Sequence, residues 1–382
     1  MRTRAATVAA ADHEATMTSP RPMLFATVVA LLVATGCGGG DAPAPEPDVT
    51  GTMMSPDPAG PCADDPWMAA DASADERARA LVAAMDVDQK VAQVHGDGGA
   101  EGVVVPGIED LCIPDLHVAD REAGTGVSAD TGDDVSATAL PAPIALAATW
   151  DPVHAASYGD VLAAEARHLG RDLVTAPVVD IARVPTAGRT HEGLGEDPLL
   201  TSTMAVAQIR AMQDRGVLAS ATHLGVDTQQ ADRATVDAVV PPRALHELYL
   251  APFEAAVVDG EVASVTCAPN RVNGTHACES TALLQTELRE GWGFDGFVRS
   301  GHGATRSTAA SVAAGLDLEL PDGAFLGEPL RRAIADGDVS EDDVDRMLVR
   351  RYVPMFRLGL FDRPAEPPDP QVEEHGAIAA AI

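Results

Sequence analysis

Short apolar runs alternate with segments of helical periodicity through most of the chain. The runs predict strands at Leu116–Asp120, Leu173–Ala182, Val217–Leu224, Ala263–Ala268, Phe294–Ser300 and Leu316–Leu320. The periodic segments predict helices at Pro152–Leu169, Leu199–Arg215, Pro242–Asp259, Ser280–Gly291, Thr305–Ala314, Gly327–Asp336 and Ser340–Phe356. The runs are apolar at nearly every position, which is typical of a parallel sheet covered on both faces.

Repeated strand–helix units over about 250 residues predict an α/β fold, a TIM-type (β/α)8-like barrel in a single domain. A doubly wound sheet is the alternative, but no Gly-x-Gly-x-x-Gly motif opens a helix after a strand. Ser73 and Glu76 form a capping-box pattern before an amphipathic segment, so we expect the barrel to occupy residues 73–365.

The first residues have the pattern of an export signal. Met23–Ala34 is an apolar run too short to span a bilayer, and Arg21 precedes it. The sequence ending at Cys37 resembles a bacterial lipobox, so residues 1–37 are interpreted as a signal peptide with Cys37 as the lipidated residue. The start is either Met1 or Met17. Residues 38–72, rich in Pro, Gly, Asp and Ala, are expected to form a flexible tether. We therefore predict an exported cell-envelope lipoprotein, attached to the membrane only through its lipid.

The chain has 58 acidic and 26 basic residues, a net charge of −32. Such a surface repels nucleic acid and anionic lipid, so neither is expected as a partner. Four cysteines remain after Cys37, and an even number in an exported chain favours two disulfides. Cys267 and Cys278 bracket a short segment rich in turn residues and are expected to pair, which leaves Cys62 with Cys112. No Cys-x-x-Cys motif or histidine cluster accompanies them, so metal binding is the weaker alternative.

Several motifs occur in order along the barrel segment. They are Ala142–Asp151, Gly188–Pro198, Glu247–Glu254, Asn270–Gly274 and Gly296–Thr305. Together they resemble glycoside hydrolase family 3, the β-glucosidase-like enzymes. The resemblance implies a retaining glycosidase that acts on a β-linked sugar or oligosaccharide without a cofactor or metal. Retaining hydrolysis needs two carboxyl groups about 5–5.5 Å apart.

The resemblance assigns Asp120, Arg189 and His223 to the sugar pocket. It places the attacking aspartate at position 301, where this chain has Gly301. Glycine has no side chain that could attack the sugar.

Three further pocket positions depart from the family pattern: Thr222 replaces a lysine, Pro269 a tyrosine and His302 a tryptophan. Asp317 and Glu319 alternate along one predicted strand and so share a face. They could serve as a relocated nucleophile, but a structural salt bridge with Arg299 is the preferred interpretation.

In two-domain members of the family the second carboxyl group comes from a following α/β domain. Residues 366–382 resemble the start of a linker toward such a domain, ending in an apolar strip. We therefore expect a β-glucosidase-like barrel with impaired catalysis. The alternatives are a non-catalytic carbohydrate-binding envelope lipoprotein and a hydrolase completed by a separate second-domain subunit.

Overall fold

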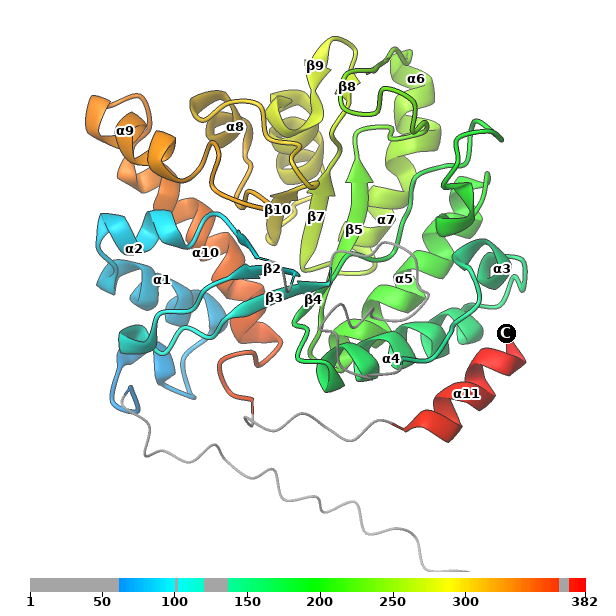
Figure 1. Cartoon of the computed structure of the whole chain (residues 1–382), viewed down its shortest axis with the longest axis horizontal. Coiled ribbons are helices and arrows are strands. Elements are labelled where there is room, and N and C mark those ends of the chain that lie inside the picture. The colour runs from blue at the N-terminus through cyan, green and yellow to red at the C-terminus, as the bar shows by residue number, and fades with distance from the viewer. Residues whose placement is uncertain (1–61, 100–101, 120–136, 364–370) are drawn as a thin grey trace, which may run out of the picture. The chain divides into compact units, whose positions relative to one another are not determined.

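The computed structural model describes residues 62–99, 102–119, 137–363 and 371–382 (Figure 1). The signal peptide, Cys37, most of the tether and Asp120 lie outside these residues, so the interpretations that concern them stay predictions. Among the described residues, no helix is both long and apolar enough to cross a membrane.

A curled sheet forms the centre of the described chain. In spatial order its strands are β1 (Asp97–Gly99), β2 (Gly102–Val105), β3 (Leu116–Ala119), β4 (Leu173–Val174), β5 (Leu218–Leu224), β7 (Ser264–Cys267) and β10 (Phe297–Ser300). Neighbours are parallel from β3 to β10, whereas β2 is antiparallel to both β1 and β3. The hairpin of β1 and β2 was not predicted: β1 is Asp97-Gly98-Gly99, which carries little strand signal, and the three valines of β2 form only a short apolar run.

The segment 316–320 closes the sheet into a barrel. The backbone amide of Ser300 donates to the carbonyl of Leu318 at 2.9 Å, and that of Glu319 donates to the carbonyl of Val94 at 3.0 Å. The segment therefore bridges β10 and the residues leading into β1, which are at opposite edges of the strand order. The fold is an α/β, TIM-like barrel, as the sequence predicted.

The predicted strand at Leu173–Ala182 is shorter than expected, since regular pairing covers only Leu173–Val174. Pro177 lacks an N–H donor and interrupts the ladder. Val179 still donates to the carbonyl of Thr222 at 2.9 Å, so the chain continues alongside β5 without forming a regular strand.

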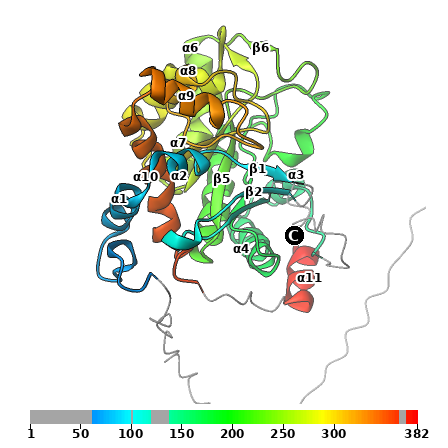
Figure 2. The same ribbon diagram turned by 60° about the vertical axis from the view of Figure 1, so that its left-hand side comes forward.

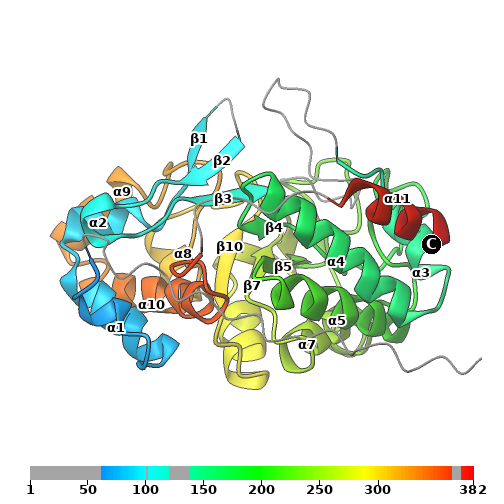
Figure 3. The same cartoon turned by 90° about the horizontal axis from the view of Figure 1, so that it is seen from below.

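Helices surround the barrel, and most lie where the sequence predicted them (Figure 2 and Figure 3). They are α1 (Ala74–Ala84), α2 (Val87–Ala92), α3 (Pro143–Ala147), α4 (Pro152–His168), α5 (Pro198–Asp214), α6 (Pro242–Ala244), α7 (Ala251–Val258), α8 (Ala309–Ala314), α9 (Glu328–Asp336), α10 (Glu341–Arg357) and α11 (Val372–Ala381). A π-helical stretch, Leu245–Leu250, joins α6 to α7, and a second one covers Ala282–Gly291. A capping box of Ser73 and Glu76 begins α1, as expected, and capping boxes also begin α2 and α10.

Three short strands form a separate small sheet: β6 (Asp237–Ala238), β8 (Arg271–Val272) and β9 (Thr275–His276).

The two disulfides join Cys62 to Cys112 and Cys267 to Cys278, which is the expected pairing. The described residues begin at Cys62, within the segment expected to be a tether. Trp67 is buried there, and its indole N–H donates to the carbonyl of Leu111 at 3.1 Å.

The apolar strip that ends the sequence lies in helix α11. Helix α11 packs against α4. His375 is buried, and its Nδ1 lies 2.9 Å from Oε1 of Glu165. Ile378 packs on the edge of the main core.

Candidate functional site

A cavity of about 180 Å³ lies at the carboxyl ends of the central strands. Its lining residues are Arg189, His223, Arg233, Thr266, Pro269, Arg299, Gly301 and His302. Five of these positions had been singled out in the sequence, although they come from distant parts of the chain. Parallel strands bring their carboxyl ends to one edge of a barrel, which explains the convergence.

β5, β7 and β10 and the segments that follow β4, β5, β7 and β10 contribute the lining residues. His223 is on β5, next to its final residue, while Pro269 and Gly301 follow β7 and β10. Gly301 donates its backbone N–H to the carbonyl of Cys267 at 2.9 Å, which fixes the two loops side by side. The cavity therefore rests on backbone that is held by the sheet.

Gly301 faces the cavity at a place where a side chain could fit. A Cβ there would lie 3.2 Å from the carbonyl oxygen of Cys267, 3.6 Å from Cβ of Ala304 and 3.9 Å from Cδ2 of His223. The first distance is tight and requires a shift of a few tenths of an ångström; the other two are ordinary contacts. The backbone at position 301 could therefore accommodate a side chain, and the fold does not require glycine there.

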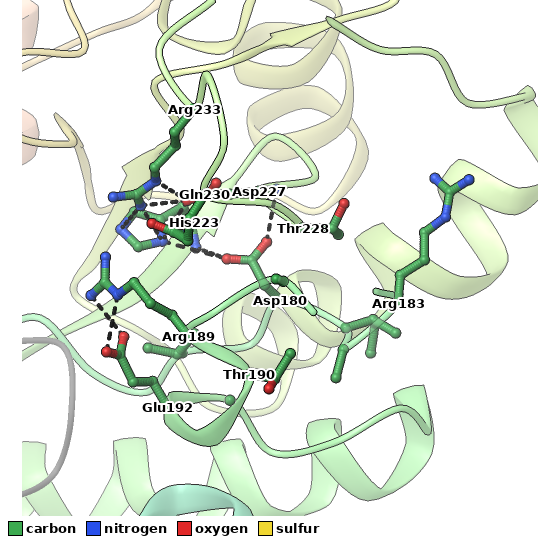
Figure 4. A pocket seen from close by; sticks show the side chains of 15 residues that line it. Asp180, Arg183, Arg189, Thr190, Glu192, His223, Asp227, Thr228, Gln230 and Arg233 are labelled. Carbon is green, nitrogen blue, oxygen red and sulfur yellow. Dashed lines mark hydrogen bonds and ion pairs between the residues drawn. The ribbon is translucent and has the colours of Figure 1, made fainter. Parts of the chain in front are cut away.

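His223 is held by a cluster of charged residues (Figure 4). Its Nδ1 lies 3.4 Å from an oxygen of Asp180 and 3.4 Å from an oxygen of Asp227. Its backbone N–H donates to Asp180 at 2.8 Å. Arg233 donates to Asp227 at 2.8 Å and places Nη2 3.2 Å from Nε2 of His223. These contacts fix the orientation of the imidazole at the cavity wall.

The turn between His223 and Asp227 depends on Gly225. Its φ is 137°, a value that side chains rarely allow, and a Cβ would lie only 2.6 Å from Cβ of Ala277. Glycine is therefore required there. The roles of Asp180 and Arg233 at this site were not predicted from the sequence. Asp180 lies inside the predicted strand Leu173–Ala182, and Arg233 follows a polar segment. Neither sequence pattern indicates which side chain the residue contacts.

Burial raises the pKa of Asp180, and the nearby charge of Asp227 acts in the same direction, while His223 opposes both. One ligand atom each from Asp180, His223 and Asp227 lie within 4.8 Å of one another, a spacing that could hold a metal ion. Arg233 already binds the Asp227 oxygen that faces His223. A cation would compete with that guanidinium, so the arrangement is better described as a charge network.

Arg189 lies in the loop after β4 and is fixed by Glu192. Its Nε donates to Oε1 at 3.0 Å and its Nη2 lies 2.7 Å from Oε2, a bidentate pair. Figure 4 shows this pair on the same side of the site as His223, while Arg183 of the same loop points away. Thr222 is fully buried and does not line the cavity.

The expected salt bridge between Arg299 and the 316–320 carboxylates is wrong. Arg299 is buried on β10 and donates to Thr175 at 2.6 Å and to Ser220 at 3.3 Å. Asp317 instead pairs with Arg289 at 2.5 Å, and Glu319 accepts from the backbone N–H of Phe325 and Leu326 at 2.9 and 2.5 Å. Neither carboxylate lines the cavity.

Asp317 and Glu319 therefore hold the barrel to its surrounding segments, with Arg289 belonging to the π-helical stretch Ala282–Gly291. Alternation correctly predicted that they share a face, but the face is the one away from the cavity.

Comparison with known proteins gives a consistent result. The Glycosyl hydrolase family 3 N terminal domain matches residues 108–352. A β-glucosidase of Rhizobium radiobacter is 37% identical over 285 residues, which are 74% of this chain and 34% of that protein. An exo-α-(1→6)-L-arabinopyranosidase of Bifidobacterium longum is 34% identical over 65% of this chain and 34% of its own length. The chain thus spans about a third of these relatives.

Solved structures agree. DesR, a β-glucosidase from Streptomyces venezuelae in complex with D-glucose, has a TM-score of 0.75 and 36% identity, covering 80% of this chain and 40% of its own. The β-glucosidase 3B of Thermotoga neapolitana, in complex with α-D-glucose, has the same TM-score at 28% identity, with 80% and 46% covered. By its motifs, its barrel and these matches, the chain belongs to glycosyl hydrolase family 3.

Proposed function

We propose that this β-glucosidase-like barrel binds a sugar at its mouth and does not hydrolyse β-glucosides. The observation that carries the proposal is Gly301. It lines the cavity at the position where the family resemblance expects the attacking aspartate. Without a carboxylate there, no covalent glycosyl intermediate can form at that position.

The rest of the cavity supports the same conclusion. No carboxyl group of the described residues lines it, whereas retaining hydrolysis needs two. Sugar-binding groups expected from the family remain at Arg189 and His223, and both are fixed by buried or half-buried partners. The relatives include β-glucosidases, one of them in complex with D-glucose, so a pyranose ring is the ligand class that we propose.

Two variants test the proposal. Gly301→Asp restores the carboxylate, and Gly301→Asn has nearly the same shape without a nucleophile. The wild-type protein and both variants should release no aryl alcohol from an activated aryl β-glucoside above a mock purification. Catalytic groups act as a unit, so restoring one without the other recovers little rate. A sugar ligand should still raise the melting temperature of the wild type.

Robust wild-type turnover would contradict the proposal. In that case a 2-fluoro glycoside that traps the covalent intermediate, followed by peptide mapping, would identify the nucleophile actually used. Strong turnover by Gly301→Asp, but not by Gly301→Asn, would show that the pocket is otherwise intact. That result would refute the expectation that restoring this one carboxylate recovers little rate.

A further inference from the structure

The disulfide Cys267–Cys278 lies directly beside the candidate site. Cys267 is the last residue of β7, and Cys278 belongs to the short helix Ala277–Glu279. Both cysteines are fully buried, so the bond lies inside the protein. Residues 267–278, which the bond closes into a loop, are named the disulfide loop. One of them, Pro269, lines the cavity, so the disulfide loop is part of the cavity wall.

Gly225, which follows β5, packs against both ends of the disulfide loop. A Cβ on Gly225 would lie 2.6 Å from Cβ of Ala277 and 2.9 Å from Cβ of Ala268. Each of these alanines is the direct sequence neighbour of a bonded cysteine. The disulfide therefore limits how far apart the two methyl groups that contact Gly225 can move.

Hydrogen bonds attach the same turn to the disulfide loop. The backbone N–H of Ala268 donates to the carbonyl of Leu224 at 2.9 Å. Asn270 is 1% exposed, and its Nδ2 donates to the carbonyl of Gly225 at 2.7 Å. The carbonyl of Asn270 in turn accepts from the backbone N–H of Ala277 at 3.1 Å, next to the disulfide. The disulfide loop thus supports the backbone of two successive residues of the turn.

The supported turn carries two residues of the site. His223 directly precedes Leu224 and lines the cavity. Asp227 lies two residues after Gly225, and one of its oxygens lies 3.4 Å from Nδ1 of His223. Polar groups of a binding site must stay within about 0.5 Å of their working positions. A shift of this turn would therefore reduce the affinity for a ligand in the cavity.

The disulfide loop also supports the segment after β10. Gly301 of that segment donates its backbone N–H to the carbonyl of Cys267 at 2.9 Å. At the other end of the bond, the helix Ala277–Glu279 packs against α8, which is the next helix after Gly301. One covalent bond therefore joins the supports of two segments of the cavity wall, those after β5 and after β10.

We propose that the cysteines of Cys267–Cys278 are positioning residues of the candidate site, which keep the 223–227 turn and Gly301 in the arrangement that binds the sugar. This inference rests on the proposed sugar-binding function. The second disulfide, Cys62–Cys112, differs in its place, since no described residue next to its cysteines lines the cavity. It closes the longer loop, with a separation of 50 residues against 11, and so contributes more to stability.

The test compares two double variants, Cys267→Ala/Cys278→Ala and Cys62→Ala/Cys112→Ala, by calorimetric titration with methyl β-D-glucopyranoside. The first should lower the affinity about ten-fold or more, because the wall of the site loses its support. The second should leave the affinity unchanged. Destabilisation alone would predict the reverse order, since the second variant opens the longer loop. Circular dichroism and the melting temperature report whether each variant is folded during the titration.

The imidazole of His223 gives a second readout, which needs no ligand. Its ring signals in a proton–carbon correlation NMR spectrum are assigned by their loss in His223→Gln. They should shift or broaden in Cys267→Ala/Cys278→Ala and stay unchanged in Cys62→Ala/Cys112→Ala. A disulfide that only stabilises the fold would leave these signals unchanged in both variants.

Two single variants keep the disulfide and test the same support if the cysteine variant does not fold. Asn270→Ala removes the donor to the carbonyl of Gly225. Asn273→Gly is the matched control in the same loop: its side chain bonds to the backbone N–H and carbonyl of Val240, at 2.9 and 3.0 Å. Its φ of 49° suits glycine. Asn270→Ala should shift the His223 signals and lower the affinity, whereas Asn273→Gly should do neither.

The outcomes separate this inference from the proposed function. Unchanged affinity and unchanged His223 signals in Cys267→Ala/Cys278→Ala, or in Asn270→Ala, would overturn the inference and leave sugar binding intact. An equal loss of affinity in both double cysteine variants would also overturn it, because the loss would then reflect stability. If the wild type does not bind the glucoside, the proposed function fails. The His223 signals then decide by themselves whether the disulfide positions the site.

Discussion

Asp317 is a fully buried carboxylate whose removal should strongly destabilise the barrel. Its oxygens lie 2.5 Å from Arg289 and 3.2 Å from Arg350, and it accepts the backbone N–H of Val298 at 2.7 Å. Exposed fractions are 0% for the Asp317 side chain and 8% for that of Arg289. Burial lowers the pKa of Arg289, and the nearby charge of Asp317 opposes this by favouring the charged guanidinium.

The substitution Asp317→Asn keeps the shape and removes the negative charge. Breaking a buried pair by neutralising one partner costs about 3–5 kcal/mol, because the other charge is left without compensation. That is a large part of the ~5–15 kcal/mol that stabilises a typical domain. The matched control is Asp295→Asn. Asp295 pairs with Arg357 at 3.3 Å but is 68% exposed, so its loss should cost about 0–1 kcal/mol.

Urea unfolding followed by tryptophan fluorescence at neutral pH measures the difference. With an m-value of about 3 kcal/mol/M, the Asp317→Asn midpoint should fall by about 1–2 M, while that of Asp295→Asn should barely move. In the double variant Asp317→Asn with Arg289→Gln, part of the loss should be recovered, since pairs in contact couple by about 0.5–3 kcal/mol. Equal midpoints for Asp317→Asn and Asp295→Asn would refute the reasoning.

Two further predictions follow from the structure. Replacing both cysteines of Cys62–Cys112 by alanine should destabilise more than doing so for Cys267–Cys278, about 4 against 3 kcal/mol, because the loops close over 50 and 11 residues. Thermal unfolding checks this, and the reverse order would contradict it. Burial raises the pKa of Glu319 above its ordinary 4.5, so its folded form binds more protons than the unfolded chain. Its contribution to stability is therefore complete below pH 4.5 and falls as the pH rises through the raised pKa. Glu319→Gln, which keeps an acceptor for Phe325 and Leu326, should flatten this part of the profile in urea titrations. An unchanged slope would show that Glu319 does not titrate abnormally.

Several features of this protein follow from local sequence alone. Apolar runs and helical periodicity predicted the barrel. Burying a strand, or one face of a helix, produces a regular pattern of apolar residues along the sequence. The capping-box pattern of Ser73 and Glu76 predicted where α1 begins, since the two residues are only three positions apart. The convergence of Arg189, His223 and Gly301 was also predictable, because the carboxyl ends of parallel strands meet at one edge.

Other features were decided only by the tertiary structure. Asp317 pairs with Arg289 and Arg350, which are 28 and 33 residues away in the sequence. It does not pair with Arg299, which is nearer in the sequence, because its side chain points away from the cavity. Pro177 shortened a predicted strand because it lacks a backbone N–H donor, and β1 formed from Asp97-Gly98-Gly99, residues with little strand preference. The ion pairs of Arg189 with Glu192 and of Arg233 with Asp227 are set by packing in three dimensions. The sequence therefore determined which residues reach the site, and the fold determined which charged partners hold them there.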